Sequence, residues 1–489
     1  MSLVNKSVYE LKNSLEKKEI NSVELSESLL SHSQKHNKKI NAIISFNPKL
    51  LDQAKESDKR RATNTLKGEL DGIPIIAKDM FCTKGLKTTA ASKMLENFIP
   101  PYSSTVVKNL QNAGALILGK ANQDEFAMGG TNEHSYFGNC LNPWNTDYVS
   151  GGSSGGSAAS VSSGFSPLSL GTDTGGSVRE PAHFCGVVGI KPTYGRLSRY
   201  GVISFASSLD QPGIMGKKVK DVALTLELAS SYDNKDATSS NCKVPSFSKN
   251  INSNIKTKKI GLLLPEDGIE TDIVNKFNDV KNLLNKEACK LVPIKFSYLS
   301  NVACVYHIIA SSEASSNLAR YDGVRYGYSA DFSKNSAKDL MDFYSTSRAE
   351  AFGKEVKRRI LLGTYVLSSG YYDAYYKKAC QLRYLIAQEF KKIFQSVDCI
   401  LLPVSGGVAL KLEANKNNVE KTYNHDWLTV GANLAGLPAL SVPVGFSSNG
   451  LPIGLQLMSS HFQEQTILDI ALNIEENLQV YKKQNSFCS

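Results

Sequence analysis

The stretch VSGGSSGGSAASVSSGFSPLSLGTDTGGSVR, residues 149–179, decides the fold of this chain. It holds two clusters dense in glycine and serine, Gly151–Ser157 and Gly175–Ser177. Glycine permits backbone conformations and close approaches that side chains would block. The apolar run Pro167–Leu170 between them predicts a short strand. The second cluster is therefore expected just after a strand, and the role of its serine is the question that the rest of the chain must answer.

Short apolar runs alternate with helical patterns on both sides of this stretch. Helices are expected over residues 7–60, 104–110, 273–285 and most of 311–395. The strand candidates are Gly72–Ala77, Ala115–Leu118, Gly186–Ile190, Gly201–Phe205, Ile260–Leu264, Leu291–Phe296, Cys399–Val404, Ala439–Val444 and Ile453–Leu457. Such alternation predicts a mixed or parallel sheet with helices outside it. Because strands recur near the C-terminus, one sheet should receive strands from both ends of the chain.

Local signals refine this outline. Ser7 and Glu10 form a capping-box pattern for a first helix, and Ser22 is a candidate cap for a second. The segment 233–258 is rich in Asn, Ser and Lys and predicts a loop. Five tyrosines in the helical region are expected to pack in the core and between helices: Tyr365, Tyr371, Tyr372, Tyr375 and Tyr376.

Composition excludes several classes of protein. The 489 residues are 41% hydrophobic and 21% charged, as in ordinary globular proteins. The net charge of +10 is spread along the chain, which favours a solvated basic surface over a nucleic-acid site. Nine scattered cysteines without a C-x-x-C pair predict free thiols, and seven histidines show no H-E-x-x-H spacing, so no metal is expected. With no apolar run of 18 residues and no leader-like N-terminus, we expect a cytoplasmic protein without a membrane segment.

Two interpretations of the serines compete. Gly151–Gly155 matches G-x-S-x-G, the nucleophile elbow of α/β-hydrolases, which would make Ser153 or Ser154 the nucleophile. That elbow needs a strand directly before it, and the polar, turn-rich residues 142–148 do not predict one. Ser177 follows an apolar run and a loop of small residues whose bare amides can converge as an oxyanion hole. Lys78, at the end of an apolar strand, can serve as its base if burial lowers its pKa.

These residues resemble the amidase signature family. The resemblance rests on GGSSGGSAAS, GTDTGGSVREPA and the upstream GIPIIAKD. It implies one α/β domain over residues 1–489, with a mixed, doubly wound sheet covered by helices on both faces. It also implies a Ser–cis-Ser–Lys triad with Ser177 as nucleophile, Ser153 as the bridging serine after a cis peptide bond and Lys78 as general base. The amides of the loop before the nucleophile, Thr174, Gly175 and Gly176, would form the oxyanion hole.

The patterns along the chain divide that domain into four sections. Residues 1–65 are expected to form N-terminal helices, and residues 70–232 the signature core. Residues 259–395 are expected to form a largely helical layer, and residues 396–470 to return to the sheet.

Further segments resemble the glutaminase subunits of tRNA-dependent amidotransferases, a branch of the family. They include GKANQDEFAMGGTNEHSYFGN, KPTYGRLSRYGVISFASSLDQPG and FGKEVKRRILLGTYVLSSGYYDAYYKKA. This branch implies hydrolysis of glutamine and delivery of ammonia to a partner, with the B and C subunits completing a heterotrimer. The B subunit would convert Glu-tRNA(Gln), and possibly Asp-tRNA(Asn), using ATP and Mg²⁺, and would make the main contact with tRNA. The chain itself would need no cofactor.

The same resemblance supplies a glutamine pocket. Such a pocket must pair an α-carboxylate with a cation and an α-ammonium with an anion. By motif position Arg359 would bind the carboxylate, Asp426 the ammonium, and Tyr306 would contact the substrate. Arg358 is a competitor for the role of Arg359, because adjacent helical residues point about 100° apart.

Two alternatives stay open at this stage. A stand-alone amidase acting on another small amide would share the triad but would not need both Arg359 and Asp426. A non-catalytic assembly protein would not need Lys78, Ser153 and Ser177 together.

Overall fold

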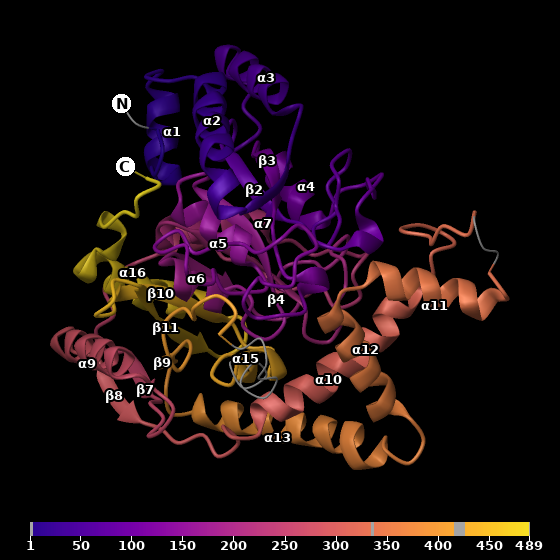
Figure 1. The fold of residues 1–489 in the computed structure, drawn as a ribbon. Coiled ribbons are helices and arrows are strands. Elements are labelled where there is room, and N and C mark those ends of the chain that lie inside the picture. The colour runs from indigo at the N-terminus through magenta and orange to yellow at the C-terminus, as the bar shows by residue number, and fades with distance from the viewer. Residues whose placement is uncertain (1–2, 334–336, 415–425, 489) are drawn as a thin grey trace.

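In the computed structural model, which describes residues 3–333, 337–414 and 426–488, eleven strands of these residues form one mixed sheet (Figure 1). The strands are β1 (Ile43–Phe46), β2 (Pro74–Lys78), β3 (Leu116–Ala121), β4 (Leu168–Asp173), β5 (Val188–Lys191), β6 (Gln211–Gly216), β7 (Lys259–Leu262), β8 (Lys290–Pro293), β9 (Cys399–Pro403), β10 (Ala439–Phe446) and β11 (Pro452–Ser459).

The strand order across the sheet is β1-β3-β2-β4-β6-β5-β10-β11-β9-β7-β8. Strands run parallel in the groups β3-β2-β4 and β9-β7-β8, and the pairs between β4 and β9 are antiparallel. Strands from residue 43 to residue 459 therefore share one sheet, which confirms that it receives strands from both ends of the chain. The region expected to be largely helical also contributes β7 and the edge strand β8.

Helices flank this sheet. They are α1 (Val8–Glu16), α2 (Ser22–Ile40), α3 (Leu50–Ala62), α4 (Thr105–Asn112), α5 (Gly155–Ser162), α6 (Arg179–Cys185), α7 (Val219–Ala229), α8 (Phe247–Asn250), α9 (Thr271–Lys286), α10 (Val302–Asn317), α11 (Leu340–Ala351), α12 (Lys354–Leu367), α13 (Lys378–Ile393), α15 (Val430–Leu434) and α16 (Glu464–Leu478). Figure 1 shows α10, α12 and α13 lying together at the side of the molecule away from α1–α3.

Strand β9 shows how two cores form on the two faces. Successive strand residues point to opposite faces. Cys399 and Leu401 belong to one apolar cluster, which includes residues of α16, whereas Ile400 and Leu402 belong to a second, which includes residues of α10 and α13. The predicted α/β fold with helices on both faces is confirmed.

Small residues let α5 lie close to the sheet. A Cβ at Gly156 would lie 2.5 Å from the carbonyl oxygens of Ala42 and Asn122. The hydroxyl of Ser157 donates to the Leu170 carbonyl at 2.9 Å, and Ser169 donates back to the Ser157 carbonyl at the same distance. The Gly/Ser composition of the opening stretch thus serves packing as well as chemistry.

One predicted strand is wrong, and two strands of the structure were not predicted. Gly201–Phe205 is not a strand, because only Val202 makes a bridge, to Phe81. β6 was missed because Gln211–Gly216 holds two glycines and a proline, which weaken the strand signal. β1 was missed because it is a four-residue strand between two helices.

The caps of the first two helices differ in outcome. The capping box of Ser7 and Glu10 is present at the start of α1, as predicted. For α2 the predicted cap was wrong: Asn21, not Ser22, caps the helix and forms a capping box with Glu24. The Ser22 hydroxyl instead donates to the Gly72 carbonyl at 3.0 Å, which links α2 to the turn before β2.

The predicted burial of the tyrosine cluster was also wrong. Tyr365, Tyr371, Tyr372 and Tyr375 are 40–48% exposed and Tyr376 is half-buried. Tyr365 lies on α12, Tyr371 and Tyr372 lie in the turn after it, and the other two lie on the π-helical turn η4 (Asp373–Lys377). Their rings contact one another. The rings of Tyr365 and Tyr371 are 4.3 Å apart. Helical spacing gathers the rings, but nothing among the described residues covers them.

Candidate active site

The parallel pairing of β2 and β4 places Lys78 beside the loop that follows β4. Ile76 is opposite Ser169 and Ala77 is opposite Leu170 in this pairing. Parallel strands end at the same edge of a sheet. Lys78, the last residue of β2, therefore lies next to the residues that lead to the loop 174–177.

Lys78 is fully buried, and its amine faces hydroxyl groups. Its Nζ donates to Ser153 Oγ at 2.7 Å, Ser154 Oγ at 2.8 Å and Thr172 Oγ1 at 2.8 Å. Burial lowers the pKa of Lys78 to about 7, although the charges of Asp124, Asp173 and Asp210 oppose this shift. A large fraction of the amine is therefore neutral near pH 7 and can accept a proton.

Ser153 follows a cis peptide bond with Gly152, as the resemblance predicted. Its carbonyl accepts a hydrogen bond from the Asp124 amide at 3.2 Å. Gly152 leaves no room for a side chain, since a Cβ there would collide with the carboxylate of Asp124. The segment after β3 thus holds the serine that faces Lys78.

Ser177 lies in the turn between β4 and α6. It is 7% exposed, whereas Ser153 and Ser154 are fully buried. The Ser177 carbonyl accepts from the Ser154 amide at 3.2 Å, so the two serine-bearing loops are joined directly. Ser177 is therefore the serine of this group that a substrate can reach most easily.

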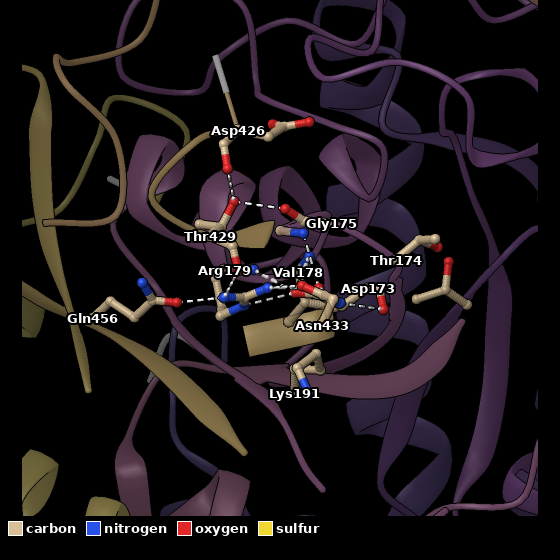
Figure 2. A network of polar contacts seen from close by, with 12 residues as sticks. Asp173, Thr174, Gly175, Val178, Arg179, Lys191, Asp426, Thr429, Asn433 and Gln456 are labelled. Carbon is tan, nitrogen blue, oxygen red and sulfur yellow. Dashed lines mark hydrogen bonds and ion pairs between the residues drawn. The ribbon is translucent and has the colours of Figure 1, made fainter. Parts of the chain in front are cut away.

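The carboxylate of Asp173 organises the loop that carries Ser177. It accepts hydrogen bonds from the amides of Gly176 at 2.9 Å and Val178 at 3.1 Å, and it forms two bonds with Arg179, at 2.9 and 3.0 Å (Figure 2). Burial opposes the charged form, but Arg179 outweighs it and lowers the pKa of Asp173. The loop therefore folds around a charged, buried carboxylate.

This contact bears on the predicted oxyanion hole. The Gly176 amide is already donated to Asp173. Among the described residues, the amides of Thr174, Gly175 and Ser177 donate to no protein acceptor. Buried amides without acceptors are rare, so these three are the better candidates to bind an oxyanion. The predicted set of Thr174, Gly175 and Gly176 stays a prediction for its first two members, the bond to Asp173 counts against Gly176, and the Ser177 amide is a further candidate.

Tyr306 of α10 lies directly on this loop. A Cβ at Gly175 would be 2.6 Å from Tyr306 Cζ, so glycine is what lets the ring approach. Burial raises the pKa of Tyr306, the charge of Arg359 opposes the shift, and Asp426 adds to it. Charges of both signs therefore act on a tyrosine that touches the candidate oxyanion loop.

The two adjacent arginines of α12 differ in exposure. The Arg359 side chain is 4% exposed, donates to Glu355 Oε1 at 2.8 Å and lies over the Phe205 ring. The Arg358 side chain is 45% exposed and pairs with Glu355 Oε2 at 2.9 Å. The buried arginine is the one whose charge acts on Tyr306.

Asp426 begins a turn that leads into α15. Its carbonyl accepts from the amides of Thr429 at 3.0 Å and Val430 at 3.1 Å. Thr429 in turn contacts the loop that carries Ser177 (Figure 2). The sequence-predicted residues thus come from β2, the loops after β3 and β4, α10, α12 and the turn before α15.

Several residues of the site were not predicted. Ser154 had been considered only as an elbow nucleophile, and Thr172, Asp173 and Thr429 not at all. The predicted strand Pro167–Leu170 ended two residues before Thr172, whereas β4 continues to Asp173. Alternation of side chains along this longer strand would have been the signal for Thr172. The elbow itself is excluded, because a turn-rich segment precedes Ser153 rather than a strand.

Neither a metal-binding cluster nor a membrane-spanning helix is found in the described part of the chain. Within residues 3–333, 337–414 and 426–488, no group of three or more His, Cys, Asp or Glu side chains is placed to hold a metal ion. In the same residues, no helix is long and apolar enough to cross a membrane.

The α/β fold and a buried lysine bonded to serine hydroxyls are what the amidase signature family would have. Comparison with known proteins agrees. The family model described as "Amidase" matches residues 24–468, and the chain belongs to this family.

Its relatives are similar over nearly their whole length. Proteins named as the A subunit of glutamyl-tRNA(Gln) amidotransferase, from Bdellovibrio bacteriovorus and Coxiella burnetii, are each 47% identical, and the aligned regions cover 97% and 98% of both chains, respectively. The crystal structure of the protein of that name from Thermotoga maritima has a TM-score of 0.79 at 37% identity, covering 96% of this chain and 94% of its own. A peptide amidase from Stenotrophomonas maltophilia has a TM-score of 0.84 at 26% identity, covering 99% of each chain.

Proposed function

We propose that this chain is the glutamine-hydrolysing subunit of a tRNA-dependent amidotransferase, acting as one amidase domain over residues 1–489. The observation that carries the proposal is the buried Lys78 amine, which is 2.7 Å from Ser153 Oγ and has a pKa of about 7. The names of the relatives, at 47% identity, support the choice of substrate and reaction.

The pocket would hold glutamine by both of its charged groups. Arg359 would pair with the α-carboxylate, Asp426 with the α-ammonium, and Tyr306 would contact the bound molecule. A guanidinium matches a carboxylate with two parallel hydrogen bonds. The burial of Arg359 favours it over the exposed Arg358 for this role.

Acylation would begin when Ser177 Oγ attacks the side-chain amide carbon of glutamine. Its proton passes to Ser153, and the proton of Ser153 passes to the neutral Lys78 amine. The oxyanion is stabilised by loop amides. The relay then returns a proton to the leaving nitrogen, the tetrahedral species collapses with loss of ammonia, and a γ-glutamyl ester remains on Ser177.

Deacylation would use the same relay a second time, with water in place of Ser177 as the nucleophile. Water attacks the ester carbonyl while Ser153 and Lys78 take up its proton. Collapse of the second tetrahedral species restores the Ser177 hydroxyl and releases glutamate. The net reaction is glutamine plus water to glutamate plus ammonia.

The ammonia would pass to the B subunit of the complex, with a small C subunit completing the heterotrimer. In this proposal the B subunit binds the misacylated tRNA and uses ATP and Mg²⁺ to amidate Glu-tRNA(Gln), or Asp-tRNA(Asn), in the cytoplasm. The name of the relatives, which specifies one lettered component of a larger enzyme and Glu-tRNA(Gln), supports this assignment.

The test is ammonia release from glutamine by the full chain, alone and with co-purified partners, tRNA and ATP. We expect release from glutamine that Ser177→Ala abolishes. Release from simple amides but not from glutamine would favour a stand-alone amidase instead. Full activity in Ser177→Ala or Lys78→Ala would contradict the mechanism.

A further inference from the structure

The peptide group between Gly175 and Gly176 is held at both ends. Thr429 Oγ1 donates to the Gly175 carbonyl at 2.6 Å, and the Gly176 amide donates to Asp173 Oδ1 at 2.9 Å (Figure 2). A peptide group is planar, so bonds at its two opposite ends fix its orientation. The threonine is 1% exposed and Asp173 is fully buried, so water does not compete for either contact.

The fixed orientation of this peptide group determines where the amides on its two sides point. The amides on either side of it belong to Gly175 and Ser177, and among the described residues neither donates to a protein acceptor. If the Gly175–Gly176 peptide turned, both amides would change direction. The hydroxyl of Thr429 therefore acts on the two groups best placed to bind an oxyanion.

Two backbone hydrogen bonds hold Thr429 itself in place. Its amide donates to the Asp426 carbonyl at 3.0 Å, and its carbonyl accepts from Arg179 Nη1 at 2.9 Å. Arg179 also binds Asp173, which closes a ring of contacts around the loop. A Cβ at Gly176 would collide with Thr429 Oγ1, so the hydroxyl lies directly against the loop backbone.

From this geometry we propose that Thr429 is a positioning residue for the oxyanion loop. Its hydroxyl orients the Gly175–Gly176 peptide, and its backbone ties that peptide to the turn that carries Asp426. Contact with the substrate α-amine and stabilisation of the oxyanion are thereby mechanically linked. This inference rests on the proposed glutaminase function.

The experiment compares Thr429→Val with Thr429→Ser in the full chain purified with its partners. Valine keeps the branched shape and loses the hydroxyl, whereas serine keeps the hydroxyl. We expect kcat for glutamine hydrolysis to fall by about 10- to 100-fold in Thr429→Val, somewhat less than the loss of a direct oxyanion donor. KM should change by less than about threefold, because the substrate charges are still bound. Thr429→Ser should keep kcat within about threefold of the wild type, because its hydroxyl can still donate to the Gly175 carbonyl.

Each outcome decides the inference. Wild-type kcat in Thr429→Val, or an equal loss in Thr429→Ser, would overturn it, because packing rather than the hydroxyl would then matter. If the valine protein does not fold, Thr429→Cys replaces it, since a thiol is a weak donor of similar size, and it should show the same loss of kcat. A wild-type complex that releases no ammonia from glutamine would count against the proposed function itself, whereas an active wild type with an undiminished valine variant would count against Thr429 alone.

Discussion

Two buried lysines are each the last residue of a strand in the same sheet, and only one of the two faces hydroxyl groups. Lys78 ends β2 and Lys191 ends β5. Burial lowers the pKa of each to about 7. Lys78 donates to the hydroxyls of Ser153, Ser154 and Thr172, whereas Lys191 donates to the carbonyls of Pro192 and Leu437.

The difference shows that a shifted pKa does not by itself mark a catalytic base. A hydroxyl can both accept and donate, so it can carry a proton between Lys78 and a nucleophile. A carbonyl only accepts, so it cannot pass a proton on. The contacts of Lys191 join the residue after β5 to the segment before β10 and have a structural use only. The hydrogen-bond partners of the amine, rather than its pKa, are therefore the reason to propose Lys78 and not Lys191 as the base.

Replacing each lysine by methionine gives the largest contrast. Lys78→Met should lower kcat for glutamine hydrolysis by about 10⁴-fold, the scale of losing the base of a catalytic triad. Lys191→Met should keep kcat within about tenfold but should lower the thermal stability, because two buried carbonyls lose their donor at about 1–3 kcal/mol each. Ammonia release and thermal unfolding measure the two effects. An equal loss of kcat in both variants would erase the distinction between the two lysines.

The second test separates the hydroxyls around Lys78. Ser153→Ala should lower kcat by about 10³-fold or more, because the relay runs through that hydroxyl. Ser154→Ala is the matched control and should lose less, about 10- to 100-fold. Its hydroxyl donates to the Thr172 carbonyl at 3.1 Å and so has a structural use. The reverse order of the two losses would place the relay on Ser154.

The adjacent arginines of α12 provide a smaller contrast, in binding. Arg359→Lys should raise KM for glutamine by about 10- to 100-fold with little change in kcat, because a lysine cannot form the two parallel bonds that a guanidinium forms with a carboxylate. Arg358→Lys should leave KM within about threefold, since the Arg358 side chain is 45% exposed. Equal effects on KM would argue against the assignment of the carboxylate to Arg359.

The pH dependence gives the smallest effect. Only the neutral amine of Lys78 accepts a proton, so kcat/KM should rise about tenfold between pH 6 and pH 8 and then level off. The two lysines change the free energy of unfolding with pH in the same direction. Between pH 7 and 10.5 the folded state binds fewer protons than the unfolded state, so stability rises with pH across that window. In Lys191→Met the rise in stability should be smaller, while the activity profile should keep its midpoint. A shifted midpoint in this variant would show that the titration of Lys191 contributes to the pH profile of activity.

Much of this site could be predicted from local sequence. The apolar run before Lys78 indicated a buried strand end, and the small residues after Leu170 indicated a tight loop. The cis bond before Ser153 came from the family resemblance rather than from the residues. What joins these pieces is the register of β2 on β4, which no local pattern specifies.

Thr429 was missed because it is distant along the chain from the loop that it contacts. Thr429 contacts Gly175 from 254 residues away, so its neighbours in sequence carry no sign of the contact. The burial of the five tyrosines between residues 365 and 376 was mispredicted for a related reason: helical spacing shows that side chains lie on one face, but not whether another element covers that face. β6 was hidden by glycine and proline; Pro212 pairs with Thr172 of β4, whereas the pairing with β5 covers only Ile214–Gly216, so a residue without an N–H fits there.

The most direct measurement of the central claim is the location of a covalent adduct. A glutamine analogue with a diazoketone in place of the amide, 6-diazo-5-oxonorleucine, should alkylate the attacking oxygen with loss of N₂, and peptide mass spectrometry of the treated complex would locate it. We expect the adduct on Ser177, absent in Ser177→Ala and formed much more slowly in Lys78→Met but at a near wild-type rate in Lys191→Met. An adduct on Ser153 or Ser154, or equal labelling rates in the two lysine variants, would contradict the assignment of Ser177 as nucleophile and Lys78 as its base.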